Sequence, residues 1–327
     1  MCDMDRNRRR LLAGLAVSPL LVSGCLSEGE EDDDPAPTTP SPPPRIGITG
    51  AGCYQPSFAG AAASNFGCGI LPSFGNPLID GPWQQEIQIQ TQFFSGVPAQ
   101  VYPLDECSPA TMNAFATPDG FILMGRYFAN DIIQRTGTNL PIAGVLAHEW
   151  AHRAQFTFGW MIRTEPTVRR TELEADMWSG LYMGLAKSWT GPLMQSYFQT
   201  LFNIGDFNFN SPNHHGTPNQ RYAAGATGIN LAFQLIQTNT RLGYEQIHAI
   251  FLNEVTRITT TIQKMSEKEL ERTLEAETDK LDLQTQLIAR RMDADWIRGI
   301  AVGKRRLDEM TTMPDMPFAE RMNLAPY

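Results

Sequence analysis

Two histidines and a glutamate lie together in the segment His148-Glu149-Trp150-Ala151-His152. Their spacing fits the pattern H-E-x-x-H, and the residues around it predict a helix. Because four residues make about one helical turn, both imidazoles project from one face and can bind the same metal ion. Glu149 directly follows the first histidine, so its carboxylate can act as general base on a water that the metal activates. The alternative is a surface helix with two solvated histidines.

A catalytic zinc site needs a third protein ligand beside the two histidines. We predict Glu172, which comes twenty residues after His152, because this length allows the motif helix to end and a second helix to begin. Asp176 lies one turn beyond Glu172 on the same face, where it can accept a hydrogen bond from a ligating histidine. Glu174 is the alternative ligand. Small and apolar neighbours predict that this helix, residues 170–188, is buried, and buried carboxylates require partners.

Two further segments accompany the histidine motif. Asn113–Gly120, with the sequence NAFATPDG, lies upstream, and His215–Arg221, with the sequence HGTPNQR, lies downstream. In this order, with HEWAH and with RTELEAD at 170–176, the chain resembles the gluzincin metallopeptidases, the superfamily that includes thermolysin. It is most similar to bacterial neutral zinc metallopeptidases and to H-E-x-x-H peptidases that process prenylated proteins or act in envelope quality control. The resemblance spans residues 113–222, roughly a third of the chain.

The resemblance implies a zincin-like fold and one catalytic zinc ion, Zn²⁺. Its ligands would be His148, His152 and Glu172, with Asp176 behind them. His215 would donate to the oxyanion that develops during the reaction. Arg221 would help to position His215 or the substrate. The neighbouring His214 leaves the choice of histidine open, and a polar loop with incidental histidines is the alternative.

The strands that the sequence predicts are few and short. Asn113–Thr117 and Phe121–Met124 flank a Pro-Asp-Gly turn and predict a hairpin at a sheet edge. In the resembled enzymes such a hairpin forms the upper rim of the cleft, where an extended peptide can add as a further strand. Two more strands are predicted at Gln85–Phe94 and Val97–Leu104, the first because polar and apolar residues alternate over Glu86–Gln90.

Helical patterns dominate the rest of the chain, except for residues 46–82, which are rich in Gly, Ala, Pro and Ser and predicted to be irregular. The expected helices cover Arg126–Arg135, the motif segment from Asn139, residues 170–188, about 191–204, 219–238 and much of 244–310. The fold class is therefore α+β: a small mixed β-sheet with an edge hairpin packed on a helical H-E-x-x-H core, zincin-like, with a helical C-terminal extension.

We expect a catalytic domain in residues 46–240 and the C-terminal extension in residues 241–327. The extension is charged and carries a patchy apolar stripe. It is therefore expected to pack on the catalytic core or to form a helical hairpin. A surface for a partner protein on these helices is the alternative.

The first residues of the chain predict export and lipid anchoring. A basic cluster, Arg6–Arg10, precedes the apolar run Leu11–Val22, and Leu21–Cys25 is similar to a bacterial lipobox. Residues 1–24 are therefore predicted to be a signal peptide and Cys25 a lipidated N-terminus. The acidic and proline-rich segment 25–45 would be a tether. The resemblance to bacterial sorting signals implies the cell envelope, at the periplasmic face of the outer membrane; export by the Sec or the twin-arginine route stays open.

The chain is acidic and poor in cysteine. Its net charge is −9, and removal of residues 1–24 takes away four arginines and two aspartates, which brings it to −11. This acidity argues against nucleic acid and anionic lipid as direct partners. In an oxidising compartment Cys53–Cys68 is the most natural disulfide, because both residues lie in one Gly/Ala-rich segment, but pairing with Cys107 stays open.

Together these features predict a membrane-tethered zinc-dependent metalloendopeptidase that hydrolyses peptide bonds of a polypeptide substrate with a metal-activated water. Two other functions stay open: a non-catalytic envelope chaperone or assembly lipoprotein with a structural zinc, and a zinc hydrolase of cell-wall peptides. A structural zinc site requires neither Glu149 nor His215, so the presence of both favours catalysis. The natural substrate, the oligomeric state and any latency of the activity are not determined by these patterns.

Overall fold

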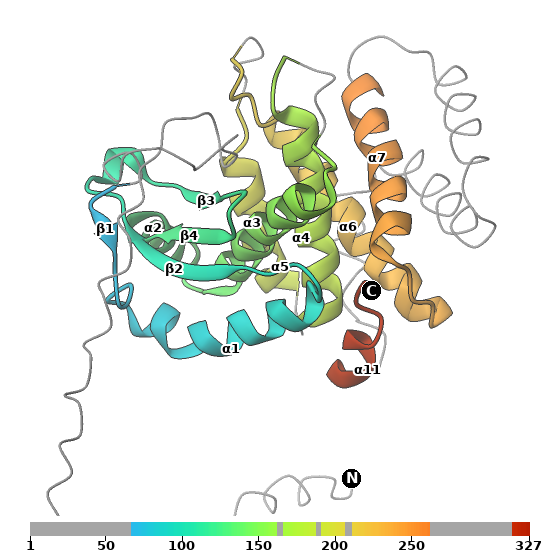
Figure 1. The fold of residues 1–327 in the computed structure, drawn as a ribbon, viewed down its shortest axis with the longest axis horizontal. Coiled ribbons are helices and arrows are strands. Elements are labelled where there is room, and N and C mark those ends of the chain that lie inside the picture. Colours follow the sequence, from blue (N-terminus) through green and yellow to red (C-terminus); the bar gives the residue numbers. More distant parts are fainter. Residues whose placement is uncertain (1–66, 162–165, 188–190, 207–210, 262–315) are drawn as a thin grey trace, which may run out of the picture. The chain divides into compact units, whose positions relative to one another are not determined.

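A computed structural model of the protein describes residues 67–161, 166–187, 191–206, 211–261 and 316–327 (Figure 1). All of them belong to one of the two units into which the chain divides, Pro43–Tyr327. The predicted signal peptide, Cys25, the tether, Cys53 and the tail beyond Thr261 as far as residue 310 lie outside the described residues. None of the helices in the described ranges combines the length and the apolar character that crossing a bilayer requires.

The described strands form one small mixed sheet. The strands are β1 (Gly69–Ile70), β2 (Gln100–Asp105), β3 (Ala114–Ala116) and β4 (Phe121–Gly125). Their order is β1-β2-β4-β3, with β2 and β4 parallel and the two outer pairs antiparallel. The mixed sheet and the hairpin at its edge, β3–β4, are therefore confirmed. The predicted strand at Val97–Leu104 is also present, shifted to Gln100–Asp105.

The predicted strand at Gln85–Phe94 is wrong, because this segment belongs to a helix, α1 (Pro77–Phe93). Asn76 caps the helix by accepting a hydrogen bond from the Leu78 N–H, and Pro77 follows it at the first helical position. Two-residue alternation covers only Glu86–Gln90. The buried side chains, in contrast, recur at helical spacing over the whole segment: Ile79, Trp83, Gln90 and Phe93. Residues 77–82, which were expected to be irregular, are the first part of this helix.

The other helices lie close to their predicted positions, except the last one, Phe318–Met322, which was not predicted. They are α2 (Arg126–Thr136), α3 (Leu140–Phe158), α4 (Arg169–Ala186), α5 (Gly191–Asn203), α6 (Pro218–Thr238), α7 (Tyr244–Thr261) and α11 (Phe318–Met322), with a short 3₁₀ turn, η2 (Pro109–Thr111), between β2 and β3. Turn residues set the ends as expected: α2 and α3 stop at Gly137 and Gly159, both in the left-handed conformation. The α7 helix is the described part of the predicted helical tail.

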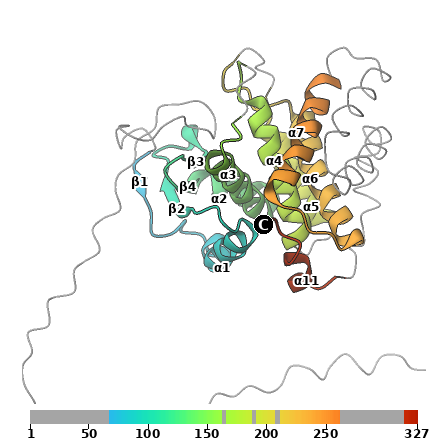
Figure 2. The same ribbon diagram turned by 45° about the vertical axis from the view of Figure 1, so that its right-hand side comes forward.

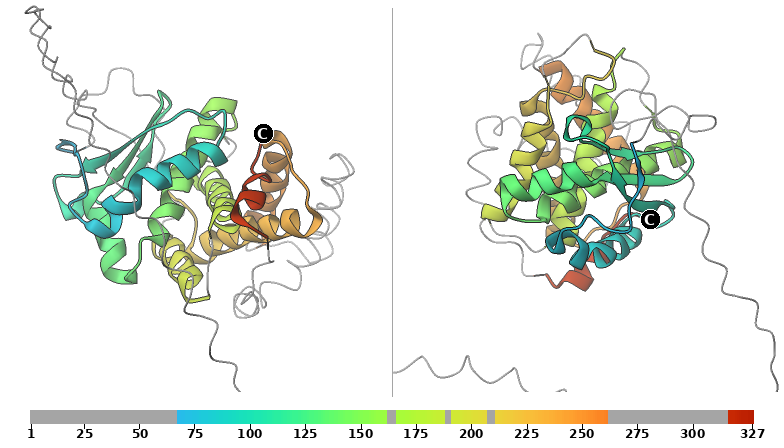
Figure 3. Two further views of the ribbon diagram at one scale, coloured as in Figure 1. Left: turned by 90° about the horizontal axis from the view of Figure 1, so that it is seen from below. Right: turned by 90° about the vertical axis from the view of Figure 1, so that its left-hand side faces the viewer.

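Helix α4 lies at the centre of the helical layer. It packs against α3, α6 and α7, and Figure 2 shows it among these helices. Every residue from Thr171 to Ala186 is buried, which confirms the buried helix that the sequence predicted. The sheet and α1 lie on one side of α4, and α7 and α11 lie on the other (Figure 3). The carboxylates of α4 are therefore held in the interior of the protein.

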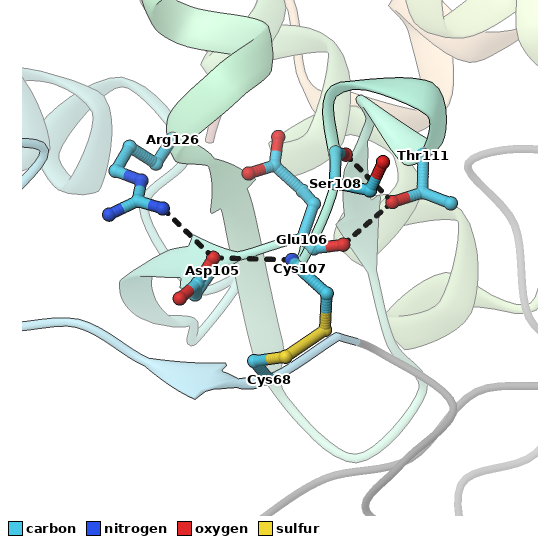
Figure 4. Close-up of a disulfide and its surroundings, with 7 residues drawn as sticks. All are labelled: Cys68, Asp105, Glu106, Cys107, Ser108, Thr111 and Arg126. Atoms are coloured by element: carbon cyan, nitrogen blue, oxygen red, sulfur yellow. Dashed lines mark hydrogen bonds and ion pairs between the residues drawn. A yellow bond between two sulfur atoms is a disulfide. The ribbon is translucent and has the colours of Figure 1, made fainter.

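A disulfide joins Cys68 to Cys107, with the two Cα atoms 5.1 Å apart (Figure 4). The predicted pairing of Cys68 with Cys53 is therefore wrong. The physical reason is strand pairing: β1 runs antiparallel to the end of β2, and the Cys68 N–H donates to the Asp105 carbonyl at 2.7 Å. This pairing brings Cys68 beside a residue 39 positions away in sequence, which nearness along the chain does not predict.

Glu106, the neighbour of Cys107, supports the start of α2. Its carboxylate accepts hydrogen bonds from the Tyr127 and Phe128 N–H groups at 2.9 and 3.0 Å. Gly125 at the N-cap position has no side chain that could do this, and a carboxylate at a helix N-terminus is stabilising. Arg126 adds an ion pair with Asp105 at 3.1 Å. The disulfide region and the following helix are thus connected through consecutive residues of one loop.

Candidate metal centre

The two histidines and the glutamate of the predicted zinc site meet in the structure. His148 and His152 lie one turn apart on α3, Glu172 lies in the first turn of α4, and all three side chains are buried. The two Nε2 atoms are 3.1 Å apart. Glu172 Oε2 is 3.1 Å from His148 Nε2, and Glu172 Oε1 is 3.5 Å from His152 Nε2. The three residues form a group that can hold a metal ion.

The hydrogen bonds of the other ring nitrogens fix the tautomers of both histidines. His148 Nδ1 is 2.9 Å from Asp176 Oδ1, and a carboxylate oxygen accepts, so Nδ1 carries the proton. His152 Nδ1 is 2.8 Å from Gln155 Oε1. The Gln155 amide has a defined orientation because its Nε2 donates to the Thr171 carbonyl and to Glu174 Oε2. With Nδ1 of each ring donating to its partner, Nε2 is the atom of each histidine that is left to bind a metal ion beside Glu172.

Three electron-pair donors thus point at one buried place, and such an arrangement requires a cation. Burial lowers the pKa of His148, but the hydrogen bonds and charges of Asp176 and Glu172 outweigh burial and raise this pKa to about 9. Burial raises the pKa of Glu172, but the charges of His152 and His215 and the hydrogen bond to His148 hold it well below its usual range. The field of the cluster therefore attracts positive charge, which a proton or a metal ion can supply.

The geometry fits a divalent metal ion. Zinc bonds to nitrogen and oxygen are about 2.0–2.2 Å long, which gives a tetrahedral edge of about 3.4 Å. In the structure the two Nε2 atoms are 3.1 Å apart, and each lies 3.1 or 3.5 Å from a different oxygen of Glu172, distances close to this edge. Glu172 Oε1 is buried and accepts no hydrogen bond from the described residues, as expected for an oxygen that faces an ion. Two imidazoles and one carboxylate are also the ligand set of catalytic zinc sites that keep a fourth position open.

Asp176 and Arg221 support the His148 side of the cluster. The guanidinium of Arg221, on α6, donates to both oxygens of Asp176 through Nε and NH2 at 2.8 Å each. Burial raises the pKa of Asp176, but the charge of Arg221 and the bond to His148 lower it overall. The place of Asp176 behind a ligand is thus as the sequence suggested. Arg221, which was expected to position His215 or the substrate, is a buried partner of Asp176.

His215 lies close enough to the cluster for its charge to act on Glu172. Its ring is 20% exposed, and its Nδ1 is 3.6 Å from Asp206 Oδ2, which also accepts the His215 N–H at 3.0 Å. Burial lowers the pKa of His215 against the opposing charge of Glu172. The adjacent His214 is only 1% exposed, and its Nδ1 is 2.6 Å from Asp206 Oδ1. This arrangement favours His215 over His214 as the histidine that a substrate can reach.

The start of α6 fixes both His215 and Arg221 in place. Thr217 and Gln220 form a capping box, in which each side chain bonds to the backbone of the other residue. His215 lies just before this box, and Arg221 directly follows it. Glu149 is buried on α3 beside His148, at the position that the H-E-x-x-H pattern gives to the general base. All the predicted site residues in this region therefore come from three elements, α3, α4 and the start of α6.

Glu174, the alternative ligand, is not part of the cluster. Two residues correspond to a rotation of about 200° around a helix, so the side chain of Glu174 projects from the side of α4 opposite to that of Glu172. There it accepts hydrogen bonds from Gln155, Trp178 and His248. Gln155 and Asp206 were not predicted. Gln155 follows His152 by about one helical turn, so this spacing could have predicted their contact. Asp206 comes from the segment after α5, and no local sequence pattern predicts its contact with the histidines.

Arg153 connects α3, the helix that carries both histidines, to the edge hairpin. Its NH1 donates to the carbonyls of Thr117 and Pro118 at 2.6 and 3.0 Å, and its Nε and NH2 donate to the Pro98 carbonyl. In the turn, the Thr117 hydroxyl donates to Asp119. Because Arg153 directly follows His152, the hairpin turn is tied to the helix that carries both histidines. The edge strand β3 also packs against α3.

Comparison with protein-family models, with curated proteins and with solved structures gave no match for this chain. The resemblance to gluzincins therefore rests on the motif residues quoted above.

Proposed function

We propose that the chain is a zinc-dependent endopeptidase of gluzincin type, held at the bacterial cell envelope by a lipid on Cys25. One observation carries the enzymatic part of this proposal. Both Nε2 atoms and the Glu172 carboxylate converge at one buried place, and the general-base candidate Glu149 directly follows His148. A structural zinc site is usually closed by four protein ligands, whereas the group within the described part of the chain has three.

The residues of the site divide the work of peptide hydrolysis. A bound zinc ion would polarise the scissile carbonyl and lower the pKa of a water. Glu149 would take a proton from the attacking water and pass it to the leaving amine. His215 would donate an N–H to the oxygen on which negative charge develops, with Asp206 orienting its ring. Asp176 and Arg221 hold His148 in the orientation that binding requires.

The edge strand β3 suggests how a polypeptide would bind. β3 is the last strand of the described sheet and packs against α3, the helix that carries the two histidines. An extended substrate could pair with this edge through main-chain hydrogen bonds, which makes little demand on its sequence. Arg153 keeps the hairpin at a fixed place relative to His152. Unfolded or extended polypeptides are therefore the proposed substrate class.

The experiment that tests this function compares the wild type with Glu149→Gln. We expect both proteins to bind one zinc ion per chain, measured by elemental analysis. Hydrolysis of an unfolded protein should fall by a factor of about 10²–10⁴ in the variant, because general acid–base catalysis typically contributes this much. A chelator should abolish the wild-type activity, and added zinc should restore it.

Three outcomes would contradict the proposal in different ways. Proteolysis that persists in Glu149→Gln would show that Glu149 is not the general base. Zinc binding without hydrolysis of either unfolded proteins or cell-wall fragments assigns the ion a structural role in an envelope chaperone or assembly factor. Cleavage of cell-wall peptides alone keeps the chemistry but changes the substrate.

A further inference from the structure

A second chain of hydrogen bonds leads away from the cluster on the His152 side. His152 Nδ1 donates to Gln155 Oε1 at 2.8 Å, and Gln155 Nε2 donates to Glu174 Oε2 at 3.1 Å. The other oxygen of Glu174, Oε1, accepts from His248 Nδ1 at 2.6 Å and from Trp178 Nε1 at 3.2 Å. The chain therefore runs from α3 through α4 to α7.

Each group in this chain has a defined role as donor or acceptor. The Gln155 amide can accept from His152 only with its oxygen toward the ring, and both acceptors of its NH₂ group, Glu174 and the Thr171 carbonyl, require the same orientation. Gln155 and Glu174 are fully buried. A buried network in which every member is satisfied is rigid, because turning one group would leave several buried polar atoms without a partner.

His248 is held by its surroundings as well as by Glu174. Its ring stacks on Trp160, with the centroids 4.3 Å apart and the planes 5° from parallel. The Trp160 Nε1–H donates to Glu245 Oε1 at 3.3 Å, one turn before His248 on α7. The side chain of His248 is 15% exposed. The series of hydrogen bonds thus ends at His248, whose ring is held between these partners. His248 lies on α7, a helix that the sequence assigned to the C-terminal extension.

We propose that Gln155, Glu174 and His248 are positioning residues that hold His152 as a metal ligand. Helix α7 would then contribute to the metal centre through His248. This inference rests on the proposed metal centre. The amide of Gln155 keeps the proton of His152 on Nδ1 and leaves Nε2 free for the ion. Glu174 fixes the amide, and His248 fixes Glu174. Outer partners of metal ligands usually change metal affinity by about 10–100-fold when they are lost.

The test measures zinc affinity of the purified full-length chain by competition with a chromophoric chelator. We expect Gln155→Met and Glu174→Gln to weaken zinc binding by about 10–100-fold, and His248→Phe, one bond further out, by about ten-fold or less. Asn253→Ala is the matched control, since Asn253 is a half-buried polar residue of the same helix that is not a member of the hydrogen-bonded network, and the zinc affinity of this variant should equal that of the wild type. Circular dichroism checks that each variant is folded.

An exchange of the two polar groups makes the test specific. Gln155→Glu alone places two carboxylates against each other and should weaken zinc binding. Combined with Glu174→Gln, the new carboxylate can accept from His152 while the new amide donates to it, so part of the lost affinity should return. The rest stays lost, because the Thr171 carbonyl has no donor at position 155 in either variant. A role that depends on size and shape alone predicts no such recovery, because the single and double variants have nearly the same volume.

A second measurement reads the tautomer of His152 directly. The chain has 5 histidines, so ¹⁵N-labelled imidazoles can be assigned in metal-free protein. We expect the proton of His152 on Nδ1 in the wild type and a shift toward Nε2 in Gln155→Met. Unchanged tautomers together with unchanged zinc affinity overturn the positioning role. A wild type that binds no zinc overturns the metal centre instead, and the tautomer measurement then still decides whether Gln155 orients His152.

Discussion

The two histidines of the cluster are supported by different groups. Behind His148, a carboxylate accepts the ring proton directly, and a bidentate arginine holds this carboxylate. Behind His152, a neutral amide accepts the ring proton, and the carboxylate lies one step further out against a histidine. Both supports orient a ring and fix its tautomer. Only the support of His148 places a negative charge in contact with the ligand.

This difference indicates that the two sides contribute differently to the metal centre. Asp176 in contact with His148 raises the basicity of that ring, whereas Gln155 orients His152 without adding charge. Arg221 is always protonated, so the buried Asp176–Arg221 pair cannot be broken without leaving an unpaired charge. We therefore expect the His148 side to be the more sensitive to substitution, and the following predictions test this ranking.

The largest effect is expected for Asp176→Asn. The variant loses the charge behind His148 and leaves Arg221 buried without its counter-ion, which should lower the free energy of unfolding by about 3–5 kcal/mol. Zinc affinity should fall by about 100-fold. Urea denaturation and chelator competition measure the two quantities.

The double variant Asp176→Asn with Arg221→Met separates the two effects of that substitution. Removal of the unpaired arginine should return much of the stability without restoring zinc affinity. If zinc affinity returns together with stability, the charge of Asp176 is not what supports His148, and the contrast between the two sides disappears.

A smaller effect is expected for Arg221→Lys. An ammonium group keeps the charge but cannot donate to both oxygens of Asp176 in the fork geometry of a guanidinium. We expect zinc affinity to fall by about ten-fold, measured by the same competition. Arg135→Lys is the control, because Arg135 forms an ion pair with Asp131 at the surface of α2 and should leave affinity unchanged. An Arg221→Lys protein with wild-type affinity would show that charge alone is sufficient.

Gly228→Ala should disturb the His148 side from a distance. Helices α4 and α6 approach so closely that a methyl group on Gly228 would overlap the Met177 carbonyl oxygen. The helices must separate, which should cost about 1–3 kcal/mol of stability and weaken zinc binding a few-fold by moving Arg221 away from Asp176. Gly81→Ala in α1, where a methyl group meets no atom, should be neutral or slightly stabilising. Equal zinc affinity in Gly228→Ala would mean that this contact does not position Arg221.

The smallest effect on affinity is expected for the double variant Cys68→Ser with Cys107→Ser. Loss of a disulfide that closes a loop of this length should lower stability by about 2–4 kcal/mol. Zinc affinity should not change, because neither cysteine contacts the supports of His148 or His152. This double variant is therefore the reference for the variants above. A change in its zinc affinity would show that lost stability alone weakens zinc binding.

Local patterns were sufficient for most of the elements that carry the site. The spacing of His148 and His152 within one turn and the glycine after α3 act over a few residues, and the helices that carry the site lie close to where the sequence patterns placed them. The short alternation in Glu86–Gln90 misled, because it spans less than two turns of a helix whose buried residues follow a longer period. A pattern of five residues cannot distinguish the two periods.

Long-range pairing could not be predicted in the same way. Cys68 meets Cys107 because β1 pairs with the end of β2, and Asp206 meets His214 and His215 where its N–H donates to the Gly216 carbonyl at 2.9 Å. Neither contact has a signal in the neighbouring sequence. Gln155 combines a local and a long-range feature. Its spacing from His152 is local, but its role becomes evident only from its contact with Glu174, which in turn contacts His248.

The sequence by itself determined which residues form the candidate metal cluster, because ligand type and helical spacing are properties of a few neighbouring residues. Tertiary structure decided how the cluster is supported. It placed Arg221 on Asp176, turned Glu174 away from the cluster and brought His248, from the predicted extension, against Glu174. The physical reason is that buried polar groups take whichever partners the packing of α3, α4, α6 and α7 brings within hydrogen-bond distance.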